Sequence, residues 1–155
     1  MYRLLFCCCL LFSLQVNAQG YIGKSKKKVE KALARYEAGT DFEQPVITLT
    51  DTSIVMVVKT KAGASTRFNY FFDAKGTCRA EQVIASCDSC YRKYLDAVLA
   101  QTAKYHWQKI NENQYISSYR EKRVLELPAE PTDYSYVILR TNWTKALYAM
   151  LPRPE

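Results

Sequence analysis

Histidine and glycine are scarce in this sequence. Its 155 residues include one histidine and five glycines. A single histidine excludes sites that need two imidazole ligands, among them the common zinc patterns. The glycines form neither a phosphate-binding loop nor a dinucleotide fingerprint, and no serine lies in a nucleophile elbow between two of them. We therefore expect no metal and no cofactor, and we do not expect an enzyme.

Long hydrophobic runs are also missing, with one exception at the N-terminus. The apolar run from Leu4 to Leu14 follows Arg3, and it is shorter than the roughly 20 residues of a membrane-spanning helix. Val16-Asn17-Ala18 then places small residues where a signal peptidase reads them. The cysteines at 7, 8 and 9 lie too early in the run for a lipid anchor. We expect a signal peptide at residues 1–18, no transmembrane segment in the mature chain, and a secreted or periplasmic protein.

The mature chain would be basic. Removing Arg3 with the signal leaves 21 basic residues against 15 acidic ones, a net charge of +6. Much of this excess lies in one short stretch, at Lys24, Lys26, Lys27, Lys28 and Lys31. Such a cluster can bind nucleic acid, an anionic membrane surface or an acidic protein. Export makes nucleic acid an unexpected partner, whereas peripheral contact with an anionic membrane stays open. The alternative is a helix face that is simply solvated.

The lysine cluster falls on a predicted helix. Apolar residues recur at helical spacing over 25–38, and Gly39 stands where helices often end. Lys26, Lys27 and Lys28 occupy the first turn, where the helix dipole favours acidic side chains. This mismatch suggests that packing or an anionic partner holds that end of the helix.

Beyond residue 45 the pattern changes to short strands. Alternating or continuous apolar runs predict strands at 46–50, 53–60, 66–73 and 77–85, joined by hairpin-like turns. The continuous run within 53–60 suits a central strand that is covered on both faces. A second helix is predicted over 88–104, followed by strands at 106–110, 114–118, 123–127 and 134–140. The fold class is α+β: a single domain, residues 19–155, with an antiparallel meander sheet and two main helices packed on one face.

The sharpest local motif is Cys87-Asp88-Ser89-Cys90, at the junction of a strand and a helix. Thiol-disulfide oxidoreductases place two cysteines in this way, because a helix N-terminus stabilises a thiolate. Against this, Asp88 opposes thiolate formation, and the preceding elements do not match a thioredoxin-like fold.

The other interpretation of the cysteines is a structural disulfide. Cys87 with Cys90 is the easier pair, since residues three apart on a first helical turn come within bonding range, and Cys78 is then free or paired between molecules. A metal site from these three cysteines and His106 is a minor option because the spacing is wide.

The N-terminal half resembles a known group of proteins. Ile22-Gly23-Lys24-Ser25 with the following helix, and then the hairpin around Tyr70-Phe71-Phe72-Asp73-Ala74-Lys75-Gly76, are similar to the helix-then-hairpin pattern of small bacterial envelope proteins of the SmpA/OmlA and beta-lactamase-inhibitor-like group. The resemblance implies an α+β fold and allows assembly or inhibitor roles. It transfers no functional residue.

Two functions follow as hypotheses. The first is a non-enzymatic exported protein that binds another protein or an envelope component through its basic helix or an exposed aromatic face of the sheet. The second is a periplasmic thiol-disulfide redox protein, with Cys87 as the nucleophile and Cys90 as the resolving thiol.

Overall fold

The computed structural model describes residues 20–130 and 134–151. The predicted signal peptide at 1–18 lies outside these residues. The described helices are α1 (Lys26–Leu33), α2 (Asp88–Leu99), α3 (Thr102–Tyr105) and α4 (Lys145–Ala149). The described strands are β1 (Val46–Leu49), β2 (Ser53–Lys59), β3 (Ser65–Phe72), β4 (Cys78–Ala85), β5 (Gln108–Asn111), β6 (Gln114–Ile116), β7 (Arg123–Glu126) and β8 (Ser135–Arg140).

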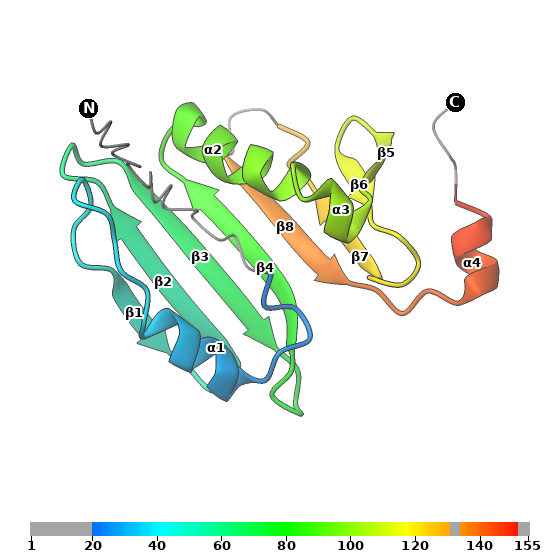
Figure 1. Cartoon of the computed structure of the whole chain (residues 1–155), viewed down its shortest axis with the longest axis horizontal. Coiled ribbons are helices and arrows are strands. Elements are labelled where there is room, and N and C mark those ends of the chain that lie inside the picture. The colour runs from blue at the N-terminus through cyan, green and yellow to red at the C-terminus, as the bar shows by residue number, and fades with distance from the viewer. Residues whose placement is uncertain (1–19, 131–133, 152–155) are drawn as a thin grey trace, which may run out of the picture.

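All eight of these strands belong to one sheet, in the order β1-β2-β3-β4-β8-β7-β6-β5. Every neighbouring pair is antiparallel. The predicted mixed α+β class and antiparallel sheet are confirmed. The described chain runs twice through the same order of elements, helix first and four consecutive strands next, and the last strands of the two halves, β4 and β8, pair at the centre (Figure 1).

The sheet has one face toward the helices and one face away from them. Figure 1 shows α1, α2 and α3 in front of the sheet. On β2, Ile54, Met56 and Val58 are buried, whereas Val55 and Val57 are only half-buried. The expectation that this strand is covered on both faces was wrong, because its side chains alternate between a core face and a less covered face.

Helix α1 is shorter than predicted. It ends at Leu33 instead of residue 38 because the hydrogen bonds tighten there: Arg35 N donates to Ala32 O and Tyr36 N donates to Leu33 O, each three residues back. Before that point the helix buries Val29 and Leu33 in the core.

The second predicted helix is divided. α2 ends at Leu99, and α3 follows after a break and ends against His106, whose backbone is left-handed with φ 50°. The Trp107 indole donates to the carbonyl of Val98 at 3.1 Å, which satisfies one carbonyl near the end of α2. Helix α4 was not predicted; its N-cap, Thr144, accepts a hydrogen bond from Leu147 N.

One hydrophobic core runs through both halves. It includes Val29 of α1, Tyr94 of α2, Ile54 of β2 and, from the second half, Leu125 and Ile138. The sheet register places these strand residues on a common row, since Ile54 pairs with Tyr70, Tyr70 with Glu81, Glu81 with Ile138, and Ile138 with Leu125. A carboxylate therefore lies in the middle of an otherwise apolar and aromatic row.

Candidate functional site

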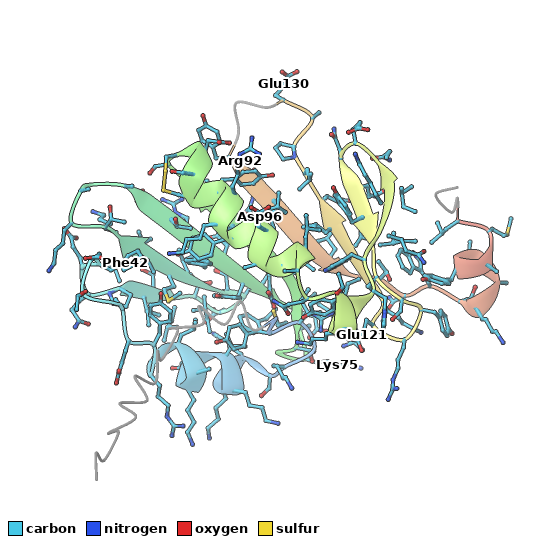
Figure 2. All side chains as sticks on the ribbon, turned by 45° about the horizontal axis from the view of Figure 1, so that its top comes forward. Phe42, Lys75, Arg92, Asp96, Glu121 and Glu130 are labelled. Carbon is cyan, nitrogen blue, oxygen red and sulfur yellow. A yellow bond between two sulfur atoms is a disulfide. The ribbon has the colours of Figure 1, made fainter. Side chains whose placement is uncertain are left out.

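The predicted lysines lie mainly on the solvent side of α1 and its N-terminal approach. Lys24, Lys27, Lys28 and Lys31 are exposed, and none of them forms an ion pair within the described residues. Figure 2 shows nitrogen-tipped side chains extending from α1 away from the sheet. Lys26 differs, because its ammonium donates to the carbonyls of Thr50 and Asp51 in the turn between β1 and β2. This lysine therefore has a structural role, while the other four are available to a partner.

Lys24 also lines a cleft that the sequence did not predict. The cleft has a volume of about 280 Å³, and Glu121 is the acidic residue in its wall. Gly23 leaves room for the Arg140 side chain, since an added Cβ would lie 3.3 Å from Arg140 Nη1, and its φ of +85° is rarely adopted by other residues. The basic residues of this cleft, called the basic cleft below, are Lys24, Arg120, Lys122, Arg123 and Arg140.

The structure thus brings two distant basic segments together. Lys24 belongs to the lysine cluster at the start of the chain, and the other four cations come from residues 120–123 and the end of β8. The local signal for the second segment was the run Arg120-Glu121-Lys122-Arg123. Its meeting with Lys24 depends on the pairing of β4 with β8 and could not be read from local pattern. We call the exposed lysines of α1 and the basic cleft together the basic surface.

Arg123 is the buried member of the basic cleft. Its side chain is 7% exposed, Nη1 donates to the Tyr105 hydroxyl at 3.0 Å, and Nη2 donates to the carbonyl of Ile22 at 3.5 Å. Its Nε is buried without a hydrogen-bond partner, and no carboxylate of the described residues lies within 4.0 Å of the guanidinium. The guanidinium also lies over the Tyr105 ring, with Cζ 4.7 Å from the ring centroid, and this cation–π contact offsets part of the cost of burying the charge.

Glu81 contacts the same segment as Arg123, the one that contains Ile22, from the interior of the protein. Its Oε1 accepts a hydrogen bond from Ile22 N at 2.7 Å. Burial raises the pKa of Glu81 to about 7, although the positive charge of Arg123 and the backbone N–H groups of Ile22 and Tyr21 oppose the rise. Ile22 thus contacts one buried acid through its N–H and one buried base through its carbonyl.

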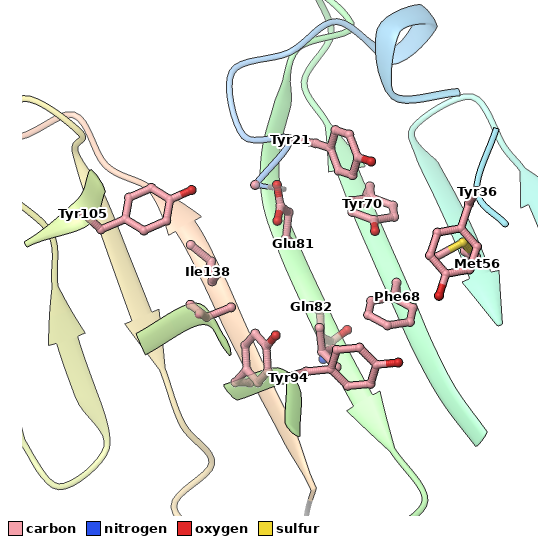
Figure 3. A pocket seen from close by; sticks show the side chains of 14 residues that line it. Tyr21, Tyr36, Met56, Phe68, Tyr70, Glu81, Gln82, Tyr94, Tyr105 and Ile138 are labelled. Carbon is pink, nitrogen blue, oxygen red and sulfur yellow. The ribbon is translucent and has the colours of Figure 1, made fainter. Parts of the chain in front are cut away.

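Glu81 lines a small cavity. It measures about 60 Å³ and lies between the sheet and α2, which is room for a few water molecules. Figure 3 shows Glu81 among the rings of Tyr21, Tyr70 and Tyr105. The pKa of the Tyr70 phenol is well above its usual value, mainly because the phenol is buried and secondly because the charge of Glu81 is near. The Tyr70 phenol therefore stays protonated at neutral pH.

Cys87 and Cys90 form a disulfide at the start of α2, with Cα atoms 5.3 Å apart (the yellow bond in Figure 2). Both residues are half-buried. Cys87 is the N-cap of α2, and its Sγ accepts a hydrogen bond from Cys90 N at 3.2 Å. Asp88, in the first turn, pairs with Arg92 at 2.8 Å. A hollow of about 190 Å³, lined in part by Asp88, Tyr91 and Arg92, lies beside this turn.

Cys78 does not take part in this disulfide. It is a fully buried free thiol at the opposite end of β4, and burial raises its pKa to about 12. His106 is exposed. Within residues 20–130 and 134–151, no group of three or more histidine, cysteine, aspartate or glutamate side chains is placed to hold a metal ion.

The aromatic side chains are mostly buried or half-buried. Tyr70, Tyr94, Tyr105 and Tyr136 are buried, and Phe71 is the one exposed aromatic side chain in the described part of the chain. An exposed aromatic face therefore receives less support than the basic surface as a place of contact.

Comparisons with models of protein families, with curated proteins and with solved structures found no match to this chain. None of the helices in the described ranges has the length and apolar character needed to cross a bilayer.

Proposed function

We propose that this chain is an exported, non-enzymatic binding protein that engages an anionic protein or envelope component through the basic surface. The observation that carries the proposal is the convergence of Lys24 with Arg120, Lys122 and Arg140 in one cleft. A helix face that only needs solvation would not require a second basic segment, about a hundred residues away in sequence, to lie beside it.

Physical chemistry indicates how such a surface would act. Clustered cations raise the local concentration of an anionic partner and speed its association, and both effects weaken as salt screens the charges. Exposed charged side chains contribute little to the free energy of unfolding. Replacing these lysines should therefore leave the fold intact. Binding and folding can therefore be separated experimentally.

The test uses capture from an envelope extract. We expect the mature protein to retain anionic components that a variant with Lys24, Lys27, Lys28 and Lys31 changed to glutamine does not retain. Lys26 is left in place because it holds the turn between β1 and β2. A matched control changes four other exposed lysines, Lys59, Lys61, Lys75 and Lys145.

If the wild type and the α1 variant capture the same components, the four changed lysines do not contribute to binding. Equal loss in the α1 variant and the control would mean that net charge, and not this surface, determines retention. Circular dichroism of each variant checks that the fold is retained.

The disulfide supports a second candidate, a thiol-disulfide redox protein. The half-exposed Cys87–Cys90 bond lies at a helix N-terminus beside a hollow. In the reduced protein, the Cys87 thiolate would attack a substrate disulfide and release one substrate thiolate. The Cys90 thiolate would then attack Cys87 Sγ, which releases the second substrate thiol and leaves the oxidised pair.

This candidate is tested by thiol labelling of the reduced protein against pH. A redox role requires the pKa of the Cys87 thiol to lie clearly below the ordinary value of about 8.5. If the labelling rate of Cys87 depends on pH as that of an ordinary thiol does, the redox role is wrong, and the disulfide only caps and cross-links the start of α2.

A further inference from the structure

We propose that the basic cleft binds a doubly charged oxyanion of the phosphate monoester class, with the guanidinium of Arg123 as its central donor. This inference rests on the proposed function, because the basic cleft is part of the basic surface, but a small anion can occupy the cleft without any macromolecular partner and without the α1 lysines Lys27, Lys28 and Lys31.

The first reason is the state of Arg123. A guanidinium has five N–H donors in a planar fork. Here Nη1 and Nη2 each make one hydrogen bond, to Tyr105 and Ile22, and the buried Nε makes none. Because Nε is enclosed, the donors left for an oxyanion in the cleft are the second N–H of Nη1 and the second N–H of Nη2, and no carboxylate of the described residues pairs with this buried guanidinium.

The second reason is that the neighbouring acid is already engaged. Glu81 accepts its hydrogen bond from Ile22 N, and the Ile22 segment lies between the acid and the arginine. Burial raises the pKa of Glu81 to about 7, so near neutrality a substantial fraction of this carboxyl is uncharged. The charge of Arg123 is therefore only partly balanced from inside the protein, and an anion in the cleft would balance it from outside.

The third reason is the charge and size of the cleft. Five basic residues and one acidic residue line it, and its volume is about 280 Å³. A monoanion such as a carboxylate would neutralise only a small part of this excess, whereas a phosphate monoester carries close to two charges at pH 7 and offers three oxygens to several donors at once. The charge of the cleft thus favours a dianion over a monoanion.

Calorimetric titration tests this site directly, with inorganic phosphate and glycerol phosphate as probes at constant ionic strength. We expect saturable binding by the mature wild-type protein and weak binding of acetate. Changing the exposed Arg120 and Arg140 to glutamine should weaken the phosphate Kd by about tenfold or more, since each removes a charge-assisted donor. The control changes Lys27 and Lys28 to glutamine, which removes the same charge outside the cleft and should leave the phosphate Kd within about twofold of the wild type.

Arg123 itself is tested by Arg123→Lys, which keeps the charge and loses the fork. Thermal unfolding first establishes whether the Arg123→Lys variant is folded. If it is not folded, the variant with Arg120 and Arg140 changed to glutamine still tests the proposal. Absence of phosphate binding by the wild type, acetate binding of equal strength, or equal weakening in the Lys27 and Lys28 control would each overturn the proposal.

A second arm distinguishes free phosphate monoesters from lipid headgroups. Vesicles with phosphatidic acid present a phosphate monoester, and vesicles with phosphatidylglycerol at matched surface charge present a diester. If the protein is retained only on phosphatidic acid vesicles, and soluble glycerol phosphate displaces it, the lipid headgroup and the free monoester share one site. Glycerol phosphate binding without vesicle binding indicates a soluble ligand. The variant with the α1 lysines Lys27, Lys28 and Lys31 changed separates this site from the proposed function. If it still binds phosphate but no longer captures envelope components, the two binding events are distinct.

Discussion

Two buried charges of opposite sign lie on either side of Ile22. Glu81 binds the Ile22 N–H at 2.7 Å, and Arg123 donates to the Ile22 carbonyl at 3.5 Å. Neither charge has an ion-pair partner within 4.0 Å among the described residues. Gly20 completes this arrangement, since a Cβ there would lie 2.6 Å from Arg123 Nη1 and from the Tyr105 hydroxyl. The N-terminal segment is thus held by polar contacts that only a small residue at position 20 allows.

Glu81 makes stability depend on pH in a defined direction. Its pKa is about 7 in the folded protein, above the ordinary value of 4.5. Stability from this group is therefore fully present below about pH 4.5 and is lost as pH rises through 7. The shift corresponds to a cost on the order of 3 kcal/mol above pH 8.

We expect Glu81→Gln to remove this dependence. The amide oxygen can still accept from Ile22 N, while the charge is gone, so the variant should gain about 2–3 kcal/mol of unfolding free energy relative to the wild type between pH 4.5 and pH 8. Urea denaturation at the two pH values measures the gain, and Glu130→Gln, at an exposed position, is the control. A difference between Glu81→Gln and wild type that does not change with pH would mean that Glu81 titrates like an exposed carboxyl.

The sequence singled out the lysines of α1 and the cysteine pair because both form local patterns, and the structure joins the cysteine pair in a disulfide. Glu81 shares strand parity with Val83 and Ala85, both buried on β4, so alternation alone could have indicated an inward carboxylate. The environment of Arg123 depends on Tyr105 and Ile22, which lie far apart in sequence, and no local pattern carries that information.

Among the elements, α2 is held at its start by a sulfur cap. Cys87 occupies the N-cap position, where side-chain acceptors for the first turn are normally oxygen atoms. The disulfide to Cys90 closes a very short loop, so its entropic contribution is small, about 2 kcal/mol in the chain-entropy model.

These two contributions can be separated with paired variants. Cys87→Ser with Cys90→Ala removes the cross-link and keeps a capping acceptor, whereas Cys87→Ala with Cys90→Ala removes both. We expect the serine version to be more stable by about 1 kcal/mol, measured by urea denaturation at pH 7. Equal stability of the two variants would show that the cap at position 87 does not matter.

Element types were more predictable than element ends. All eight strands lie close to the predicted ranges, because hairpin turns interrupt the period-two pattern clearly. The helices differed: α1 stops at Leu33 although periodic residues continue, and the segment after Leu99 breaks into α3. Helix ends depend on where backbone carbonyls find other partners, such as the Trp107 indole on Val98 O, and periodicity does not report such contacts.

The whole molecule owes its basic surface to the way its halves are joined. β4 pairs with β8 from Ala80–Leu139 to Ile84–Ser135, so the last strand of each half lies at the centre of the sheet. The hydrophobic core crosses this junction. The turn that precedes β7 and the end of β8 thereby meet the segment that precedes α1, and Lys24 joins the cations of the second half in the basic cleft. A local reading of either half could not predict this meeting.

Elution from a heparin column in a salt gradient tests the central claim most directly, because the immobilised polyanion probes contiguous positive surface without knowledge of the natural partner. The proteins compared are the wild type, the variant with Lys24, Lys27, Lys28 and Lys31 changed to glutamine, the variant with Arg120 and Arg140 changed to glutamine, and charge-matched controls at Lys59, Lys61, Lys75 and Lys145. We expect both basic-surface variants to elute at clearly lower salt than their controls, since each loses contacts that release counterions. Elution of variants and controls at the same salt would contradict the account, because only net charge would then matter.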